Sequence, residues 1–314
     1  MAADWSDYVI RQATEEEQRA RDRLTFAAWG EKLTVYEYVA REAALRQQAW
    51  ARENMQTWLL LEGVRVVSSC EAFRMLSTLK GEAGFAYAIA SVFTEPHLRK
   101  RGYAARLVDG VCKQLASDGQ AQSVILFSDV GAALYERLRF VARPAFDCVL
   151  PAELGDPGAE VKLLSPGDAA HALAQAVRPQ DEYLVWPNAV QLDWHAERAR
   201  YYARVLRSMP VSTAGAECDG ATIFWAGDFR NNRLRVLLLD APSSEVAARL
   251  LTAAQRTAAR SDLREVCIWQ TPSTAVLGSE AGVVRERQGG LPMIRPLKAF
   301  SAEAWRTIPR AIWV

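Results

Sequence analysis

The sequence predicts an α/β fold in two domains that repeat one succession of strands and helices. A strand pattern at 87–92 is followed by a loop, a helix, a buried strand, a short helix and a further strand. The segment PAELGDPG at 151–158 has the proline and glycine density of an interdomain linker. A similar order of strands and helices returns beyond it. We therefore expect one domain over residues 1–150 and another over 159–314.

Composition limits the classes of partner. The chain has 314 residues, half of them apolar, which is enough for two domains with cores of their own. Lys and Arg number 38 against 37 Asp and Glu, so there is no excess of positive charge for nucleic acid. The five cysteines are far apart and the three histidines are scattered, which predicts neither a metal site nor a disulfide framework.

The lengths of the apolar segments and the pattern of the first residues indicate where the protein is expected to be located. The apolar run at 236–239 is far shorter than the roughly 20 residues that cross a bilayer. The first residues lack a basic segment followed by an apolar run, the pattern of a secretory signal. We therefore expect a cytoplasmic protein without a membrane partner.

The first elements of the chain precede the central strand. Residues 8–12 have a strand pattern, and Thr14 with Glu17 forms a capping box that opens a helix. A second helix is predicted over 35–53, with apolar residues spaced for one buried face. A hairpin with a Glu-Gly turn follows over 57–69. Its second strand should lie beside the central strand.

The turn after the central strand has a spacing with a physical function. Arg99, Gly102 and Ala104 satisfy Arg/Gln-x-x-Gly-x-Gly/Ala at the start of a helix predicted over 102–118. Backbone N–H groups at a helix start lack partners and can bind a diphosphate where no bulky side chain intervenes. Glycine and alanine also occur there for capping alone. The predicted phosphate-binding residues are Arg99, Lys100, Arg101, Gly102, Tyr103 and Ala104.

The order of the next elements carries a family resemblance. A buried strand at 123–127 is followed by Asp129, a short helix with Tyr135 and an alternating strand at 140–150. This order resembles the core of the GNAT superfamily of acetyl-CoA-dependent N-acetyltransferases. The resemblance implies a GNAT fold, a mixed α/β (α+β) architecture in which helices flank a central sheet. It also implies acetyl-CoA as cosubstrate, and the scattered histidines and cysteines predict no metal.

The second half looks like a degenerate copy of that fold. After Leu239 the chain reads DAPSSEVAARLL, which lacks the loop motif. Asp240 and Glu245 stand where a diphosphate would be repelled. We expect a GNAT-like domain without a CoA site that completes the substrate pocket.

A closer resemblance spans both domains. It is to the fungal lysine acetyltransferases of lysine catabolism, which acetylate the ε-amine of free L-lysine, although members of such a family differ in acceptor. It is carried by SSCEAFRM (68–75), SVFTEPHLRKRGYAARL (91–107), FSDVGAALYERLRF (127–140), WPNAVQLDWHAERARYY (186–202) and LPMI (291–294).

Acetyl transfer to an amine requires a base, because an amine with a pKa near 10.4 is almost fully charged at neutral pH. Glu71, Glu95 and Asp129 are the candidate carboxylates near the central strand. Each has an alternative explanation. Glu71 and Glu95 would be solvated side chains, and Asp129 would be a helix cap.

The thioester needs an oxyanion donor and its thiolate needs an acid. The backbone N–H groups of Val92 or Phe93 would stabilise the tetrahedral intermediate if the strand bulges there. The resemblance implies that Tyr135 protonates the leaving sulfur or hydrogen-bonds to it. Packing in the core is the alternative for this tyrosine.

A free amino acid as acceptor would present a carboxylate. Arg74 is our candidate partner for it, since guanidinium binds carboxylate in a bidentate manner. Trp194 and His195 of the second domain would add a wall around the aliphatic stem, unless they only pack that domain. Two other functions stay open: a protein or peptide acetyltransferase with an open groove, and a non-catalytic CoA-binding sensor.

Overall fold

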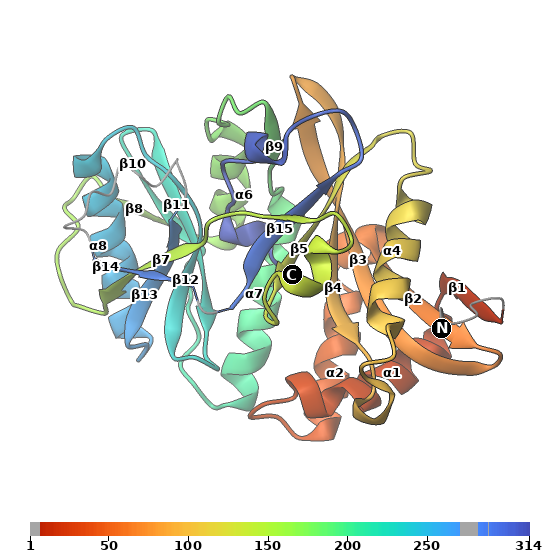
Figure 1. The fold of residues 1–314 in the computed structure, drawn as a ribbon. Coiled ribbons are helices and arrows are strands. Elements are labelled where there is room, and N and C mark those ends of the chain that lie inside the picture. Colours follow the sequence, from red (N-terminus) through yellow and green to blue (C-terminus); the bar gives the residue numbers. More distant parts are fainter. Residues whose placement is uncertain (1–6, 271–281, 288) are drawn as a thin grey trace. The chain divides into compact units, whose positions relative to one another are not determined.

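The computed structural model describes residues 7–270, 282–287 and 289–314, so six N-terminal residues used for the localisation argument lie outside it. The chain forms two compact units (Figure 1). The first domain consists of Met1–Arg143, Gly289–Ala302 and Val314, and the second of Pro144–Gln288 and Glu303–Trp313. Among the described residues, every helix is too short or too polar to cross a lipid bilayer.

The first domain is built on a mixed sheet with the strand order β1-β2-β3-β4-β5-β15-β6. Only the central pair, β4 and β5, is parallel along this path, and its other neighbours are antiparallel. The strands are β1 (Tyr8–Gln12), β2 (Met55–Glu62), β3 (Arg65–Leu79), β4 (Glu82–Phe93), β5 (Ala121–Ser128), β6 (Val141–Ala142) and β15 (Leu291–Pro296).

The helices of the first domain differ from the prediction in one place. Thr14 forms the expected capping box with Glu17 at the start of α1. The helix predicted over 35–53 is two helices, because Gln48 has an extended backbone with ψ of 142° and ends the hydrogen-bond ladder. The helices are α1 (Glu15–Trp29), α2 (Val35–Arg46), α3 (Ala49–Asn54), α4 (Tyr103–Leu115) and α5 (Ala133–Glu136), with a 3-10 turn at Pro96–Leu98.

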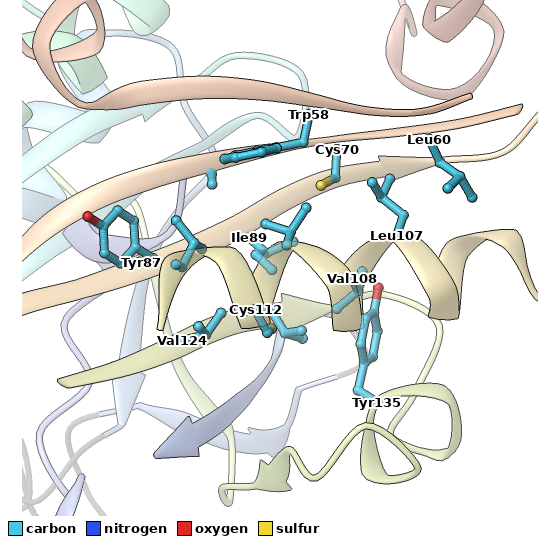
Figure 2. Packing of buried hydrophobic residues seen from close by; sticks show 14 of the residues in the cluster. Trp58, Leu60, Cys70, Tyr87, Ile89, Leu107, Val108, Cys112, Val124 and Tyr135 are labelled. Carbon is cyan, nitrogen blue, oxygen red and sulfur yellow. The ribbon is translucent and has the colours of Figure 1, made fainter. Parts of the chain in front are cut away.

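The main core of the first domain lies between the sheet and α4 (Figure 2). Leu107, Val108 and Val111 of α4 are fully buried, as their spacing predicts. They pack against strand residues such as Cys70 and Ile89. Successive strand residues point to opposite faces of a sheet. Cys70 therefore faces α4, whereas the residues directly before and after it on β3 face away from that helix.

The second domain contains another mixed sheet, with the order β14-β7-β13-β12-β11-β10-β8. Its parallel pair is β12 with β13, which α8 connects, so the two sheets share one construction. The strands are β7 (Phe146–Pro151), β8 (Lys162–Leu164), β10 (Gly215–Cys218), β11 (Ala221–Asp228), β12 (Arg233–Asp240), β13 (Glu265–Gln270) and β14 (Val283–Glu286). The helices are α6 (Pro166–Gln175), α7 (Ala189–Val205) and α8 (Ser244–Arg260), and a short strand, β9, spans Tyr183–Val185.

The division of the chain differs from the predicted ranges in two segments. β7 pairs antiparallel with β13, so the chain already belongs to the second domain from Pro144. β15 returns to the first domain and pairs with both β5 and β6. The segment 151–158, predicted to be the linker, therefore lies inside the second domain between β7 and β8. The proline and glycine content of this segment correctly predicts a connection, but it does not indicate which elements the segment connects.

Candidate active site

The central strand β4 carries a bulge near its end. Ala90 pairs with Glu71 and Phe93 pairs with Ser69, so two residues of β4 lie opposite the single residue between them on β3. The first of these two, Ser91, has a positive φ of 51°, which is uncommon for a residue with a side chain. A bulge redirects the local backbone groups. The bulge that the prediction for Val92 and Phe93 required is therefore present.

Beside the bulge, β4 separates from β5. Their parallel pairing runs from Phe85 with Ala121 to Ile89 with Leu126 and is not found farther along, although β5 continues to Ser128. Within the described residues, the last part of β4 therefore lacks a strand partner on this edge. Such an edge offers N–H and C=O groups to an extended ligand.

The helix that follows begins without a side-chain cap. Gly102 is the N-cap residue of α4 and has a φ of 85°, a conformation that glycine adopts without strain. Within the described residues, no side chain caps α4, and its first turn contains no acidic residue. Arg99, Lys100 and Arg101 are exposed before it, and the Arg99 Nε donates to the carbonyl of Thr94 at 3.0 Å. The helix dipole and these cations favour an anion at this position.

The ring of Tyr135 packs in the core, and its hydroxyl group is available for a hydrogen bond. The residue lies on α5, is 7% exposed and packs its ring edge-on against Phe140, with centroids 6.0 Å apart. Burial raises its pKa to about 12, so the phenol keeps its proton at neutral pH. Figure 2 shows the hydroxyl pointing toward α4 near Val108. Within the described residues, no hydrogen-bond partner of this hydroxyl is found. The ring therefore packs in the core, as the alternative explanation for Tyr135 proposed, and the hydroxyl can still donate a hydrogen bond.

Of the three predicted carboxylates, Glu71 is the buried one. It lies on β3 opposite Ala90, next to the bulge, and its Oε1 accepts from Arg21 Nη1 at 2.7 Å. Burial raises the pKa of Glu71, and the Arg21 guanidinium opposes that rise. A carboxyl group with a raised pKa is a better proton acceptor from an ammonium group than an exposed one.

Glu95 and Asp129 occupy more exposed positions. Glu95 follows the bulged strand, and its Oε2 lies 3.8 Å from His97 Nδ1. Asp129 follows β5, and its Oδ1 accepts from the backbone N–H of Gly290 at 2.8 Å. Asp129 thus holds the turn before β15. It is not the cap of α5 that its alternative explanation assumed, because the N-cap residue of that helix is Ala132.

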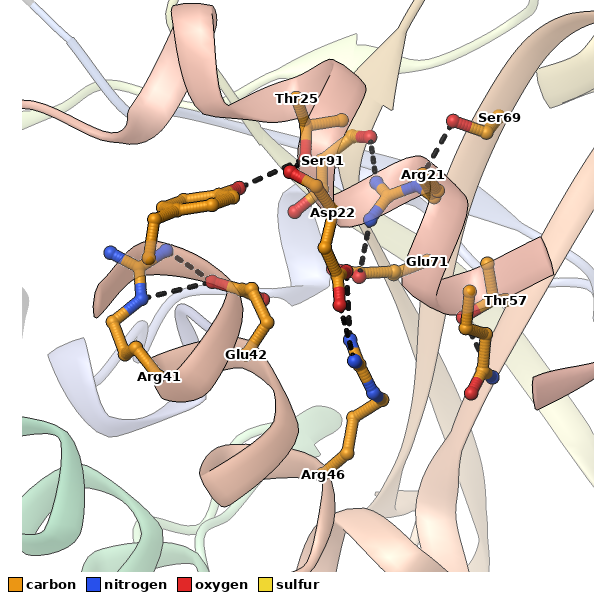
Figure 3. Close-up of polar contacts among 12 residues, drawn as sticks. Arg21, Asp22, Thr25, Arg41, Glu42, Arg46, Thr57, Ser69, Glu71 and Ser91 are labelled. Atoms are coloured by element: carbon orange, nitrogen blue, oxygen red, sulfur yellow. Dashed lines mark hydrogen bonds and ion pairs between the residues drawn. The ribbon is translucent and has the colours of Figure 1, made fainter. Parts of the chain in front are cut away.

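Sequence reasoning missed Arg21, which lies on α1 and contacts two neighbouring strands (Figure 3). Its Nε donates to Ser69 Oγ at 2.9 Å, and its Nη2 donates to the carbonyl of Ser91 at 2.7 Å. With the Glu71 ion pair, these bonds join α1, β3 and the bulge of β4. One signal was available: the inward face of α1 carries Arg21, Asp22 and Thr25 where an amphipathic helix would carry apolar residues.

A second ion pair lies beside Arg21. Asp22 is fully buried, and its Oδ1 accepts from Arg46 Nη1 of α2 at 2.9 Å. Burial raises the pKa of Asp22, while Arg46 acts in the opposite direction. On the same side of the domain, the Arg41 guanidinium lies 4.5 Å from the ring centroid of Tyr38 and its Nε donates to Glu42. Paired charges therefore join α1 to the sheet through Arg21 and α1 to α2 through Asp22.

The structure does not bring Arg74 to the bulge. Arg74 pairs with Tyr87, five residues before Val92, a separation of roughly 16 Å along the strand. Its Nε donates to Asn54 Oδ1 at 3.3 Å, and its guanidinium lies 4.8 Å from the ring centroid of Phe85. Its predicted role at an acceptor carboxylate thus gains no geometric support.

Trp194 and His195 lie on α7 and are buried within the second domain. The His195 Nε2 donates to the carbonyl of Ala311 at 2.7 Å, and the two rings meet edge-to-face. Burial and the nearby Arg310 lower the pKa of His195 to about 3, so the imidazole is neutral. These contacts fit the packing alternative. Across the described part of the chain, no group of His, Cys, Asp and Glu side chains is arranged to hold a metal ion.

Both halves of the chain match known domain families. Residues 9–140 match the family described as Acetyltransferase (GNAT) domain, and residues 168–299 match the LYC1 GNAT-like C-terminal domain. Among curated proteins, no sequence is similar enough to count as a match.

Solved structures share the fold over nearly the whole chain. A GCN5-related N-acetyltransferase from Kribbella flavida is 19% identical, with a TM-score of 0.59 over 93% of this chain and 72% of that one. A probable N-acyltransferase from Enterococcus faecalis is 13% identical, with a TM-score of 0.62 over 92% and 72%. A tandem GNAT protein from the clavulanic acid biosynthesis pathway is 13% identical, with a TM-score of 0.51 over 94% and 100%. The two-domain GNAT architecture predicted from sequence is confirmed.

Proposed function

We propose that this chain, an acyltransferase of the GNAT superfamily, transfers the acetyl group of acetyl-CoA to the amine of a small molecule, most specifically the ε-amine of free L-lysine. GNAT acetyltransferases use acetyl-CoA. One observation supports our assignment of the acetyl-CoA site to the first domain. This is the uncapped start of α4 at Gly102, directly after a bulged strand that has separated from β5.

Each part of acetyl-CoA has a counterpart in this geometry. The diphosphate would accept hydrogen bonds from backbone N–H groups in the 99–104 loop, whose side chains add positive charge. The pantetheine amides would pair with the free edge of β4, as an added strand does. The thioester would then lie beside the bulge at Val92.

The reaction proceeds by direct attack in a ternary complex. Glu71 is our candidate base for the ammonium proton, directly or through water, and Glu95 and Asp129 are the alternatives. The neutral amine adds to the thioester carbon, and the carbonyl oxygen, now negative, accepts from the N–H of Val92 or Phe93. The C–S bond then breaks, and the thiolate takes a proton from Tyr135. The second proton of the nitrogen restores the Tyr135 hydroxyl through water, and the one proton released overall leaves from the base to solvent.

The match of residues 168–299 to the LYC1 GNAT-like C-terminal domain supports the lysine assignment. The test is to incubate the purified chain with acetyl-CoA and separate panels of free amino acids, other amines and lysine-containing peptides. Released thiol and the acetylated product, identified by mass spectrometry, are the measurements. We expect turnover with L-lysine. Acetylated peptides without any free-amine product would replace this proposal with a peptide acetyltransferase, and CoA binding without turnover would indicate a sensor.

Tyr135→Phe tests the assigned acid. The ring and its packing against Phe140 are kept, and only the hydroxyl is lost. General acid catalysis typically contributes about 10²-fold or more, so we expect kcat to fall by about two orders of magnitude with little change in the KM for acetyl-CoA. Unchanged turnover would remove the acid role from Tyr135.

A further inference from the structure

We propose that Arg21 is a positioning residue that fixes the bulge of β4 and thereby aims the Val92 N–H at the thioester oxygen. The inference rests on the proposed function, because it assigns a purpose to the bulge in acetyl transfer. Neither the loop motif nor the comparisons assign a role to this arginine. Its location on α1 separates it from the central strand by 70 residues of sequence.

The contacts of Arg21 match its guanidinium group. Three of its N–H groups donate to three acceptors: Ser69 Oγ at 2.9 Å, Glu71 Oε1 at 2.7 Å and the Ser91 carbonyl at 2.7 Å. The planar guanidinium presents its donors in a rigid fork, so three acceptors fix its orientation. Ser69 and Glu71 belong to β3, which flanks the bulge. Arg21 thus couples the position of β3 to Ser91, the bulge residue of β4 with a positive φ.

The bond to Ser91 determines where the next N–H points. The Ser91 carbonyl and the Val92 N–H belong to one planar trans peptide, in which the two groups point in opposite directions. Because Arg21 holds the carbonyl from the α1 side, the Val92 N–H points away from α1. That direction leads from the buried ion pairs toward the side of β4 where acetyl-CoA is proposed to bind.

The bulge also needs to be held. Ser91 has a φ of 51°, a region that residues with a Cβ avoid and that persists only where surrounding contacts maintain it. The Arg21 bond to its carbonyl is such a contact. Without it, we expect the Ser91–Val92 peptide to sample other orientations, which would misplace the oxyanion donor.

The experiment compares Arg21→Lys with the matched control Arg46→Lys. Both arginines are largely buried and each pairs with a carboxylate, but only Arg21 donates to the bulge. Lysine keeps the charge beside Glu71 and cannot reach all three acceptors. We expect kcat of Arg21→Lys to fall about tenfold to hundredfold, because small misplacements of catalytic groups have effects of that size. Its KM for acetyl-CoA should stay within about twofold, and Arg46→Lys should retain most of its turnover.

Two further measurements separate positioning from general stability. Hydrogen exchange of peptides covering 88–94, measured without substrate, should accelerate in Arg21→Lys and not in Arg46→Lys. Adding Ser91→Gly should restore about fivefold of the lost kcat in Arg21→Lys, since glycine adopts positive φ without support.

Equal kcat and equal exchange in the two lysine variants, or no recovery with Ser91→Gly, would overturn the role of Arg21. A wild-type chain that transfers no acetyl group would instead refute the proposed function. In that case the exchange experiment still shows whether Arg21 holds the bulge.

Discussion

The two domains place a helix at the same point of the fold and start it in opposite ways. α4 connects the parallel strands β4 and β5 and begins at Gly102, with no side-chain cap and no acid in its first turn. α8 connects the parallel strands β12 and β13 and begins at Ser243, whose side chain accepts from the N–H of Val246 at 3.3 Å. Glu245 adds a negative charge to the first turn of α8.

The strands before these helices are more alike than the helix starts. In the second domain, Phe224 pairs with Leu238 and Trp225 with Val236, so β12 also carries an extra residue. Its parallel pairing with β13 extends only to Arg235, whereas β12 continues to Asp240. A bulge and separated strands therefore occur in both domains. The first turn of the helix, rather than the strand geometry, therefore distinguishes the predicted phosphate site.

The largest effect is expected from giving α4 the first-turn residue of α8. Ala104 and Glu245 are each the second residue of their helix. Ala104→Glu should raise the KM for acetyl-CoA about 100-fold, because like charges brought together at a binding site cost several kcal/mol. Folding should not suffer, since an acid in the first turn favours the helix. Steady-state kinetics measures the KM for acetyl-CoA, and titration calorimetry measures the affinity for CoA. The control Glu245→Ala should leave the KM and the affinity unchanged. An unchanged KM in Ala104→Glu would refute the loop assignment.

The second effect concerns the buried histidine of the second domain. The pKa of His195 is about 3 in the fold, below its ordinary value of 6.5, so the unfolded chain binds a proton that the folded chain does not. Stability should therefore fall as pH decreases from about 6.5 toward 3, by about 2 kcal/mol at pH 5. Denaturant unfolding at pH 7 and pH 5 measures this change. His195→Gln should flatten the dependence, and an equal slope in that variant would show that His195 is not its source.

The smallest effect should come from removing the cap of α8. Ser243→Ala leaves the Val246 N–H without its side-chain acceptor and should lower the free energy of unfolding by about 1 kcal/mol. The KM for acetyl-CoA should not change, because we expect no CoA at this helix. Thermal unfolding and steady-state kinetics are measured on the same preparation. A shifted KM would show that the second domain takes part in cofactor binding.

Local signals predicted the site best. The Gly102 turn and the apolar face of α4 follow from spacings within one or two turns of chain, whereas Tyr135 is assigned from the resemblance to the GNAT superfamily. Arg21 could not be found in this way, because its partners Ser69 and Ser91 are 48 and 70 residues away. The bulge itself depends on strand register, which one sequence does not specify.

The position of Arg74, which differs from the expected one, has a local explanation in the alternation of β3. Glu71 and Arg74 are three apart on one strand, so strand alternation places them on opposite faces of the sheet. The side chains of Glu71 and Arg74 therefore cannot both face one acceptor site on the same side of the sheet. The domain boundary is a different case, because the pairing of β7 with β13 and of β15 with β5 joins segments far apart in sequence.

The position of β15 has a consequence for biosynthesis. Leu291–Pro296 fills the place between β5 and β6, so the first sheet lacks an interior strand until residue 296 has left the ribosome. Meanwhile β5 presents an unpaired edge, the kind of surface on which nascent chains associate. The first domain therefore cannot complete its sheet before β15 is translated, and a fragment that ends at residue 143 should be recovered as aggregate.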